Sequence, residues 1–159
     1  MKKSRPAGDD PGTEECLRMA RLCLSASLRR TERLVTRHYD EHLASSGVTA
    51  VQLPMLAVIA ASEHPTFRLL SERLHLDRST LSRNLAVLTQ KRLVSVAPSA
   101  GPKAGRISLT VKGRTALRNA HGRWMEAHRA LEHALSGDGL SDALDMLRSL
   151  RRAVRTVAD

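Results

Sequence analysis

Aromatic residues are scarce in this chain: its 159 residues include one phenylalanine, one tyrosine and one tryptophan. The core is therefore expected to be aliphatic. A platform that stacks single-stranded nucleic-acid bases is not expected, because such platforms need several exposed rings. Long apolar runs are missing as well, since the longest, from Leu53 to Ala61, contains Pro54 and is far too short to span a membrane.

Cysteine is also rare, and disulfide bonds from only two residues, Cys16 and Cys23, cannot stabilise a chain of this size. Residues 1–12 contain no apolar segment that would serve as a secretion signal. We therefore expect a cytoplasmic protein, kept in a reducing compartment, with a disordered tail over residues 1–13.

Signatures of catalysis and of metal binding are missing from the sequence. It has no His-Glu-x-x-His motif, no Gly-x-Gly-x-x-Gly loop after a predicted strand and no phosphate-cradling loop. His38 and His42 share one helical face, as do His121 and His128, but such a pair supplies at most two of the ligands that a metal site needs. We expect solvated histidines, no enzyme activity and no bound metal or cofactor.

Acidic residues are nearly absent from one segment of the chain. Residues 64–123 hold twelve Lys and Arg against two Asp and Glu, a net charge of +10 that equals the net charge of the whole chain. Positive charge concentrated in this way is typical of a protein that binds a polyanion. Charge alone does not separate DNA from RNA or anionic lipid, and a basic surface that serves solubility is the alternative.

Apolar periodicity predicts long helices at both ends of the chain. The first runs without proline or glycine from Glu14 to about Ser46, and Gly47 ends it. Near the other end, a helix capped by Thr110 is separated from a final helix by the glycines of residues 137–139. The apolar stripes consist of Leu17, Ala20, Leu24, Leu28, Val35 and Tyr39 in the first helix and Leu140, Ala143, Leu144, Leu147, Leu150, Val154 and Val157 in the last.

Shorter elements are predicted between these long helices. Three short helices are expected, opened by Thr49, Thr66 and Asp77, because each of these residues can cap a first turn. The first covers residues 49–61, with an irregularity at Pro54, which has no backbone N–H. A turn at 75–76 joins the other two, and strands over 94–96 and 106–109 follow around a turn-rich tip.

The helix that Asp77 opens has two unlike faces. Its inward face is expected to consist of Leu81, Leu85 and Leu88, and its outward face of Ser79, Ser82, Arg83 and Ala86. A helix that enters the major groove, about 12 Å wide, needs a small outer face that can form hydrogen bonds. Two short helices, a tight turn and a hairpin describe a winged helix-turn-helix, and an ordinary surface helix rich in serine is the alternative.

The stretch from Leu70 to Leu85, LSERLHLDRSTLSRNL, followed by Leu88 and Leu93-Val94, resembles the helix-turn-helix of the multiple-antibiotic-resistance regulator (MarR) family. Leu109-Thr-Val-Lys-Gly113 matches that family's Leu-Thr-x-x-Gly at the end of the wing. Segments 29–33, 36–39 and 46–49 and Gln52 are similar to its first two helices. The resemblance covers roughly residues 15–157.

The resemblance implies a mainly α-helical protein with a small β-hairpin wing, a homodimer that binds a palindromic operator in double-stranded DNA. It divides the chain into an N-terminal dimerisation helix (14–48), a DNA-binding lobe (49–112) and C-terminal dimerisation helices (113–159). We expect a repressor that a small molecule, in relatives often an aromatic anion, releases from DNA. Arg30, Arg33 and Arg37 share a face that suits such an anion, DNA phosphate or solvent equally well.

The residues predicted to contact DNA are Arg78, Ser79, Thr80, Ser82 and Arg83 of the recognition helix and Lys103 and Arg106 of the wing. In the wing, the family's usual Asp-x-Arg corresponds to Gly101 and Lys103, so a cation remains without the aspartate that orients it. We expect this wing to contact phosphate, or the minor groove loosely, and Arg106 is close enough to substitute.

Cys16 and Cys23 leave a second mode of regulation open. Seven residues apart on one helix, they are separated by about 10.5 Å along its axis, which is beyond disulfide reach within one chain. Some members of the family sense hydroperoxides with a cysteine of the first helix, so the alternative function is a thiol-based redox-sensing repressor. The sequence is also compatible with two small residues packed at a dimer interface, and with a sequence-tolerant architectural DNA binder.

Overall fold

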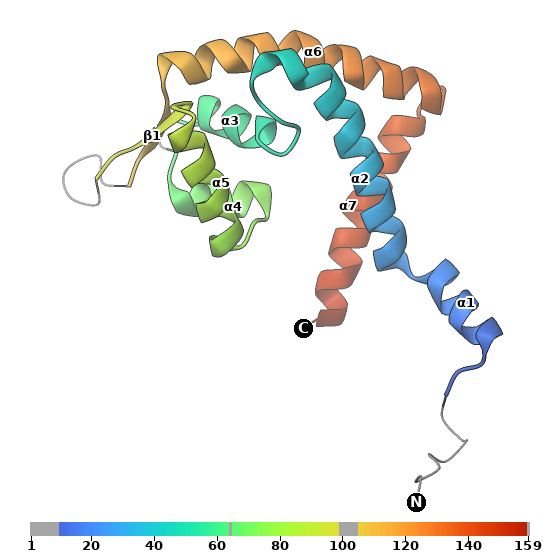
Figure 1. Ribbon diagram of the computed structural model, residues 1–159. Helices are drawn as coiled ribbons and strands as arrows, with labels where there is room; N and C mark the ends of the chain where they lie inside the picture. Colours follow the sequence, from blue (N-terminus) through green and yellow to red (C-terminus); the bar gives the residue numbers. More distant parts are fainter. Residues whose placement is uncertain (1–9, 64, 99–104, 159) are drawn as a thin grey trace, which may run out of the picture. The chain divides into compact units, whose positions relative to one another are not determined.

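The structure is a computed structural model that describes residues 10–63, 65–98 and 105–158, and the chain divides into two compact units, Met1–Arg37 and His38–Asp159. The described ranges are mainly helical with one antiparallel pair of strands, which confirms the predicted fold class. No helix in these ranges combines the length and apolarity that crossing a membrane requires. In chain order the elements are α1 (Thr13–Leu22), α2 (Leu24–Leu43), the 3-10 helix η1 (Ala44–Ser46), α3 (Leu53–Ala60), α4 (Phe67–Leu74), α5 (Arg78–Gln90), β1 (Val94–Val96), β2 (Ile107–Leu109), α6 (Val111–Leu135) and α7 (Gly139–Ala158) (Figure 1).

Cys23 interrupts the first predicted helix. The prediction of one helix from Glu14 to about Ser46 is wrong, because Cys23 has an extended backbone (ψ 103°) between α1 and α2, where Figure 1 shows a bend. No residue of α1 is buried, so no packing within its unit holds a continuous helix at this point. Cysteine and the serines that follow it also have weak helix propensity. The predicted end is confirmed, since Gly47 has a left-handed backbone with φ 81°.

The helix predicted to begin at Thr49 begins at Leu53 instead. Thr49 and Gln52 do form a capping box: the Gln52 N–H donates to Thr49 Oγ1 (3.4 Å), and the Thr49 N–H donates to Gln52 Oε1 (3.3 Å). These bonds close a turn that precedes the helix. The Leu53 N–H donates to the Thr49 carbonyl (2.9 Å), but Pro54, at the start of α3, has no N–H to donate to the carbonyl of Ala50, so the series of helical bonds is interrupted there.

An aliphatic core, as predicted, fills the second unit between α3, α4, α5, α6 and the strands. The single phenylalanine, tyrosine and tryptophan are only partly buried and pack against this core. Its largest fully buried side chains are Leu43, Met55, Leu56, Leu70, Leu81, Leu88 and Ile107.

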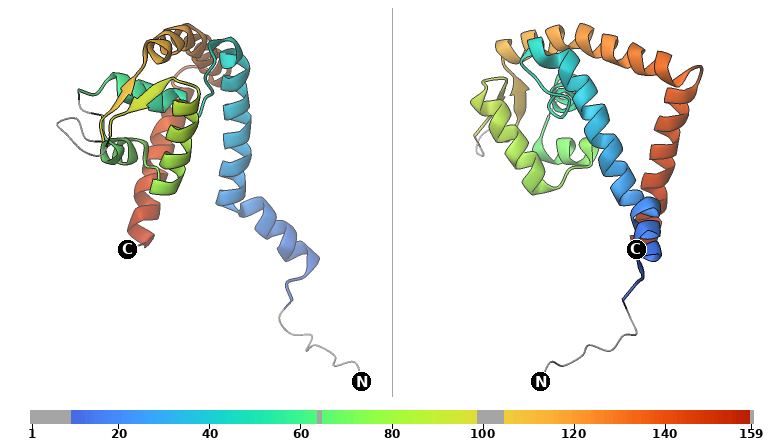
Figure 2. Two further views of the ribbon diagram at one scale, coloured as in Figure 1. Left: turned by 60° about the vertical axis from the view of Figure 1, so that its left-hand side comes forward. Right: turned by 45° about the vertical axis from the view of Figure 1, so that its right-hand side comes forward.

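β1 and β2 form the predicted hairpin, with Ser95 opposite Ser108 at its centre, and Figure 2 shows the hairpin beside α5. Arg106, predicted as the first residue of the return strand, precedes β2 and forms an isolated bridge with Thr66. The next backbone N–H donates to the carbonyl of Pro65 (2.7 Å). The segment before α4 therefore pairs with the wing next to β2, as a short third strand would. Sequence periodicity did not predict this pairing.

α6 begins as predicted at its cap, where Thr110 Oγ1 accepts a hydrogen bond from the Gly113 N–H (3.0 Å). Ser136 and Gly137 both have positive φ and separate α6 from α7. The large apolar side chains of the terminal helices remain exposed in the single chain, namely Leu17, Met19, Leu22, Leu24, Leu28, Leu34 and Val35 of α1 and α2 and Leu144, Met146, Leu147, Val154 and Val157 of α7.

Candidate nucleic-acid interface

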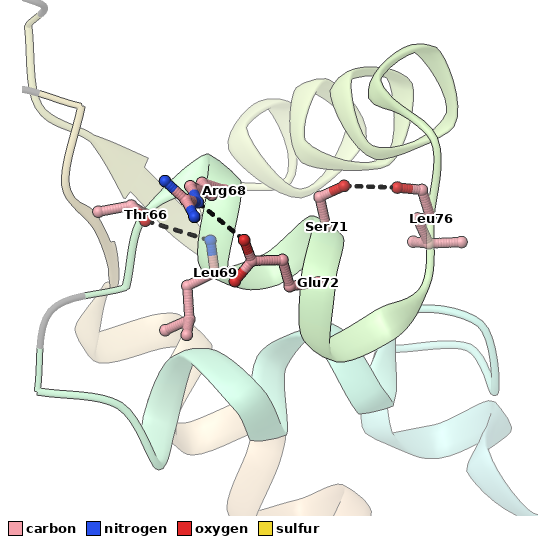
Figure 3. A network of polar contacts seen from close by, with 6 residues as sticks. All are labelled: Thr66, Arg68, Leu69, Ser71, Glu72 and Leu76. Carbon is pink, nitrogen blue, oxygen red and sulfur yellow. Dashed lines mark hydrogen bonds and ion pairs between the residues drawn. The ribbon is translucent and has the colours of Figure 1, made fainter.

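The helix-turn-helix starts with α4, a short helix that is capped by the residue before it. Thr66 Oγ1 accepts a hydrogen bond from the Leu69 N–H (3.2 Å), as its sequence position predicts. On the exposed side of the same helix, Arg68 Nε donates to Glu72 Oε1 (2.7 Å). Figure 3 shows both contacts beside the turn that follows.

The turn between α4 and α5 is fixed by two hydrogen bonds between Ser71 and Leu76. The Leu76 N–H donates to the Ser71 carbonyl (3.2 Å), and the Ser71 hydroxyl donates to the Leu76 carbonyl (2.7 Å; Figure 3). Between them, His75 has a left-handed backbone (φ 53°), which is uncommon for a residue with a side chain. The turn predicted at residues 75–76 is thus confirmed.

Asp77 caps α5 and orders its first turn. Its Oδ1 accepts hydrogen bonds from the Ser79 hydroxyl (2.6 Å) and the Thr80 N–H (2.9 Å), and its Oδ2 accepts one from the Thr80 hydroxyl (2.7 Å). These bonds, led by the one from Ser79, hold the pKa of Asp77 well below its ordinary value. The carboxylate is therefore ionised at neutral pH and holds two hydroxyls of the predicted DNA-contact set in place.

α5 has the two unlike faces that its sequence predicts. The inward residues Leu81, Leu85 and Leu88 are all buried. The outward residues Ser79, Ser82, Arg83 and Ala86 are all exposed. The apolar face anchors the helix in the core and leaves the small outer face exposed.

Arg78 and Arg83 are both positioned by neighbours within the chain. The guanidinium of Arg78 lies over the ring of Phe67, with 5.6 Å from its Cζ to the ring centroid, which is a cation–π contact between the first residues of α5 and α4. Arg83 Nη2 donates to the hydroxyl of Thr80 (3.4 Å), and Thr80 is half-buried. The sequence analysis did not identify Phe67 as a residue of the site. The one feature of the sequence that could have indicated it is its position directly after the helix cap Thr66.

The structure describes one of the two predicted wing residues. Lys103 lies outside the described residues. Arg106 is half-buried and directly precedes β2. It lines a pocket of about 440 Å³ together with Glu63 and Arg114. The fold thus brings five of the seven predicted DNA-contact residues together on α5 and places Arg106 beside Thr66.

A second pocket, of about 520 Å³, lies in the unit that contains the helix-turn-helix. Its walls come from the end of α2, from α3 with the turn before it, and from α6. A volume of this size is typical of small-molecule sites. Sequence periodicity did not predict it. Its lining residues are Tyr39, Leu43, Ala50, Leu53, Pro54, Ala57, Leu117, His121 and Trp124.

Two aromatic residues of this pocket meet at His128. The Tyr39 hydroxyl lies 3.2 Å from His128 Nδ1, and the Trp124 and His128 rings stack with centroids 4.7 Å apart. His128 Nε2 lies 3.6 Å from Glu132 Oε1. Burial, and after it the negative charge of Glu132, raises the pKa of Tyr39. One histidine therefore holds both aromatic walls in position.

The prediction of solvated histidines is wrong for His38, His42 and His128, all of which are half-buried. His38 Nε2 lies 2.9 Å from the carbonyl oxygen of Ala127, and His42 Nδ1 lies 2.8 Å from the carbonyl oxygen of His38. The last turns of α2 lie against α6. The face of α2 that carries His38 and His42, and the position of His128 on α6, are therefore partly buried. His121 is exposed, as predicted. Among the described residues, no three His, Cys, Asp or Glu side chains are grouped closely enough to hold a metal ion.

Cys16 and Cys23 are exposed, and both thiols are free. Cys16 lies in α1, and its Sγ is 3.5 Å from the carbonyl oxygen of Pro11. Cys23 lies at the interruption, outside both flanking helices. Arg30, Arg33 and Arg37 are exposed on α2 in the same unit of the chain.

Comparison with known proteins finds one family. Residues 46–104 match the family model described as the MarR family. The transcriptional regulator MosR of M. tuberculosis, solved with DNA, is 32% identical, with 85% of this chain and 98% of that chain covered and a TM-score of 0.75. A mutant MarR from E. coli, solved with operator DNA, is 23% identical, with 89% and 99% covered and a TM-score of 0.68. The transcriptional repressor CouR bound to p-coumaroyl-CoA is 22% identical, with 90% and 99% covered and a TM-score of 0.75. The last two show a shared fold. No curated protein sequence matches this chain.

Proposed function

This chain belongs to the MarR family of transcriptional regulators, and we propose that it is a homodimeric repressor that binds a palindromic operator in double-stranded DNA until a small-molecule effector releases it. MosR of M. tuberculosis, which is 32% identical and was solved with DNA, supports the nucleic-acid partner. The matched structures are regulators and not enzymes.

The outer face of α5 carries this proposal. Three buried leucines anchor the helix, and its exposed residues are small or polar, so it fits a major groove. Residues 64–123, which include α5, carry a net charge equal to that of the whole chain, and this charge attracts the phosphate backbone. In this arrangement Ser79, Ser82 and Arg83 read bases or hold phosphates. Arg78, Thr80 and Lys103 contact the flanking backbone, and Arg106 is the residue that could substitute for Lys103 in the wing.

The exposed apolar side chains of α1, α2 and α7 support a homodimer. Extended apolar surface on a single chain marks an association site. We assign residues 14–48 and 113–159 to dimerisation and residues 49–112 to DNA binding. A two-fold dimer presents two copies of α5 to half-sites about one duplex turn apart, which accounts for a palindromic operator. Light scattering during size-exclusion chromatography tests this state, and a monomeric mass would contradict it.

Affinity selection of genomic fragments tests the operator. The recovered site and a shuffled duplex of equal length are then titrated by fluorescence anisotropy at one salt concentration. A sequence-specific regulator binds its site about 10³-fold or more tightly than other DNA. A ratio near one would support an architectural DNA binder instead. The genes beside the recovered site then narrow the choice of effector.

Arg83 and Arg129 form a matched pair for testing the interface. Both are exposed arginines, one on the outer face of α5 and the other on α6. Arg83→Ala is expected to lower operator affinity by about tenfold or more, because it removes a base or phosphate contact. Arg129→Ala is expected to leave affinity unchanged. Equal losses in the two variants would show that α5 does not face the DNA.

For the effector site we propose the 520 Å³ pocket between α2, α3 and α6. The pocket touches both the end of α2 and α3, which packs against α4 of the helix-turn-helix. A molecule bound there can change the position of α4 and α5, and so the spacing of the two recognition helices in the dimer. Release of labelled operator on effector addition tests this link.

A thiol-based switch is the second candidate, favoured by Cys23, which is exposed at the interruption between α1 and α2. Oxidation to a bridge between subunits would change the first helices of both copies. Peroxide is expected to weaken DNA binding by the wild type, and Cys16→Ser and Cys23→Ser should abolish that response. If the wild type and the two serine variants bind DNA equally well after peroxide treatment, the thiol-based switch is excluded.

A further inference from the structure

We infer that the 520 Å³ pocket takes an uncharged, largely apolar molecule with one hydrogen-bonding group, and not an anion. This inference rests on the proposed function, which makes the pocket the effector site, and it narrows the chemical class of the effector. It departs from the aromatic anion that the family resemblance implies.

The lining holds no permanently charged partner for an anion. Six of its nine residues are leucine, alanine or proline, and Lys, Arg, Asp and Glu are missing from the described lining. A carboxylate bound there would lose its water without gaining a cation, which costs several kcal/mol in an apolar site. An alcohol, amide or ketone of the same shape avoids that cost.

Two arginines of α6 are next in sequence to lining residues, yet neither lines the pocket: Arg118 and Arg123. Arg118 Nη2 donates to the Thr115 hydroxyl (3.3 Å), and Arg123 Nη1 donates to Glu126 Oε2 (3.2 Å). Both guanidinium groups are thus engaged elsewhere on α6.

The lining has three polar side chains, those of Tyr39, His121 and Trp124, and the Trp124 ring stacks on His128. Tyr39 directs its hydroxyl to His128, so that oxygen is already partnered. The imidazole of His121 is exposed, and its ring nitrogens can donate or accept a hydrogen bond. A neutral hydroxyl or carbonyl on the ligand can pair with a nitrogen of this ring.

Trp124 supplies a direct readout, because it is the sole tryptophan of the chain and lines the pocket. The full-length protein is titrated with 4-phenylbutan-1-ol and with 4-phenylbutanoate, which share a skeleton and differ in charge, at about pH 8, where imidazoles are neutral. We expect saturable quenching by the alcohol and binding of the carboxylate at least about tenfold weaker. Equal or tighter binding of the carboxylate overturns the inference. So does the absence of saturable binding by either probe, which would mean that protein, from this chain or a second copy, fills the pocket.

Ala57→Arg tests the charge argument directly. Ala57 is exposed on α3 and lines the pocket, so an arginine fits there without disturbing the core. The variant is expected to bind the carboxylate about tenfold more tightly than the wild type does, while its affinity for the alcohol changes little. Asn119→Arg is the control, because Asn119 is exposed on α6 and does not line the pocket. An unchanged preference in Ala57→Arg would show that the probes bind elsewhere.

The experiments distinguish a wrong ligand class from a wrong proposed function. Operator binding by the unliganded protein does not involve the pocket, so it persists if the ligand class is wrong. If quenching follows the expected preference but the alcohol does not release DNA, the ligand class holds and the regulatory link fails.

Discussion

Gly113, near the start of α6, lies against the backbone of Leu93, so close that a Cβ atom at Gly113 would stand 1.9 Å from the Leu93 carbonyl oxygen. The same carbonyl accepts a hydrogen bond from the Thr110 N–H (3.1 Å), which joins α6 to the chain just before β1. The glycine of the Leu-Thr-x-x-Gly motif is thus required by close approach of two backbones.

Gly113→Ala is expected to destabilise the protein by about 1–3 kcal/mol, because the backbone of α6 or of Leu93 has to shift to admit the methyl group. Gly122→Ala is the control, since Gly122 also lies within α6 but has open space at its Cβ position. There alanine should stabilise the helix by about 0.5–1 kcal/mol. Urea unfolding of both variants measures the two effects, and effects of equal sign would contradict the packing at Gly113.

Local signals in the sequence predicted much of the helix-turn-helix. The caps Thr66, Asp77 and Thr110 act within three residues of themselves, so the pattern alone identifies them. The faces of α5 follow from leucines spaced four and three apart. The pocket and the contact of Tyr39 with His128 join segments 89 residues apart, which no local pattern reports. The break at Cys23 contains neither glycine nor proline, so it carried no signal that helix-breaking rules recognise.

Asp77→Asn is expected to remove part of the pH dependence of stability. The pKa of Asp77 is lowered in the folded protein, so its contribution is present above the ordinary value of about 4 and is lost as the pH falls through the folded value. Asparagine caps helices nearly as well but does not titrate, so the variant should still fold. The unfolding free energy of the wild type should therefore fall more steeply below about pH 4 than that of the variant. Parallel curves would contradict the role of Asp77.

In the wing, Lys103→Ala is expected to lower operator affinity more than Arg106→Ala does. Lys103 lies outside the described residues, and its role rests on its place in the family's wing motif. Arg106 is half-buried, and its backbone forms a β-bridge with Thr66. Both features limit the reach of Arg106 toward DNA. Loss of one phosphate contact should also reduce the slope of log affinity against log salt by about one in Lys103→Ala. A larger loss in Arg106→Ala would make Arg106 the wing contact.

Tyr39 offers a test of the pocket wall, because it is the only tyrosine of the chain and its phenolate absorbs in the ultraviolet. Burial and the charge of Glu132 raise the pKa of Tyr39, so its absorbance should change above pH 10 in the folded protein and near pH 10 in urea. Its contribution to stability is full below about pH 10, the ordinary value, and is lost as the pH rises through the folded value. Glu132→Gln should move the folded titration back toward the ordinary value without abolishing the shift, because burial is the larger cause. A titration unaffected by Glu132→Gln would leave burial as the sole cause and separate Tyr39 from the His128–Glu132 pair.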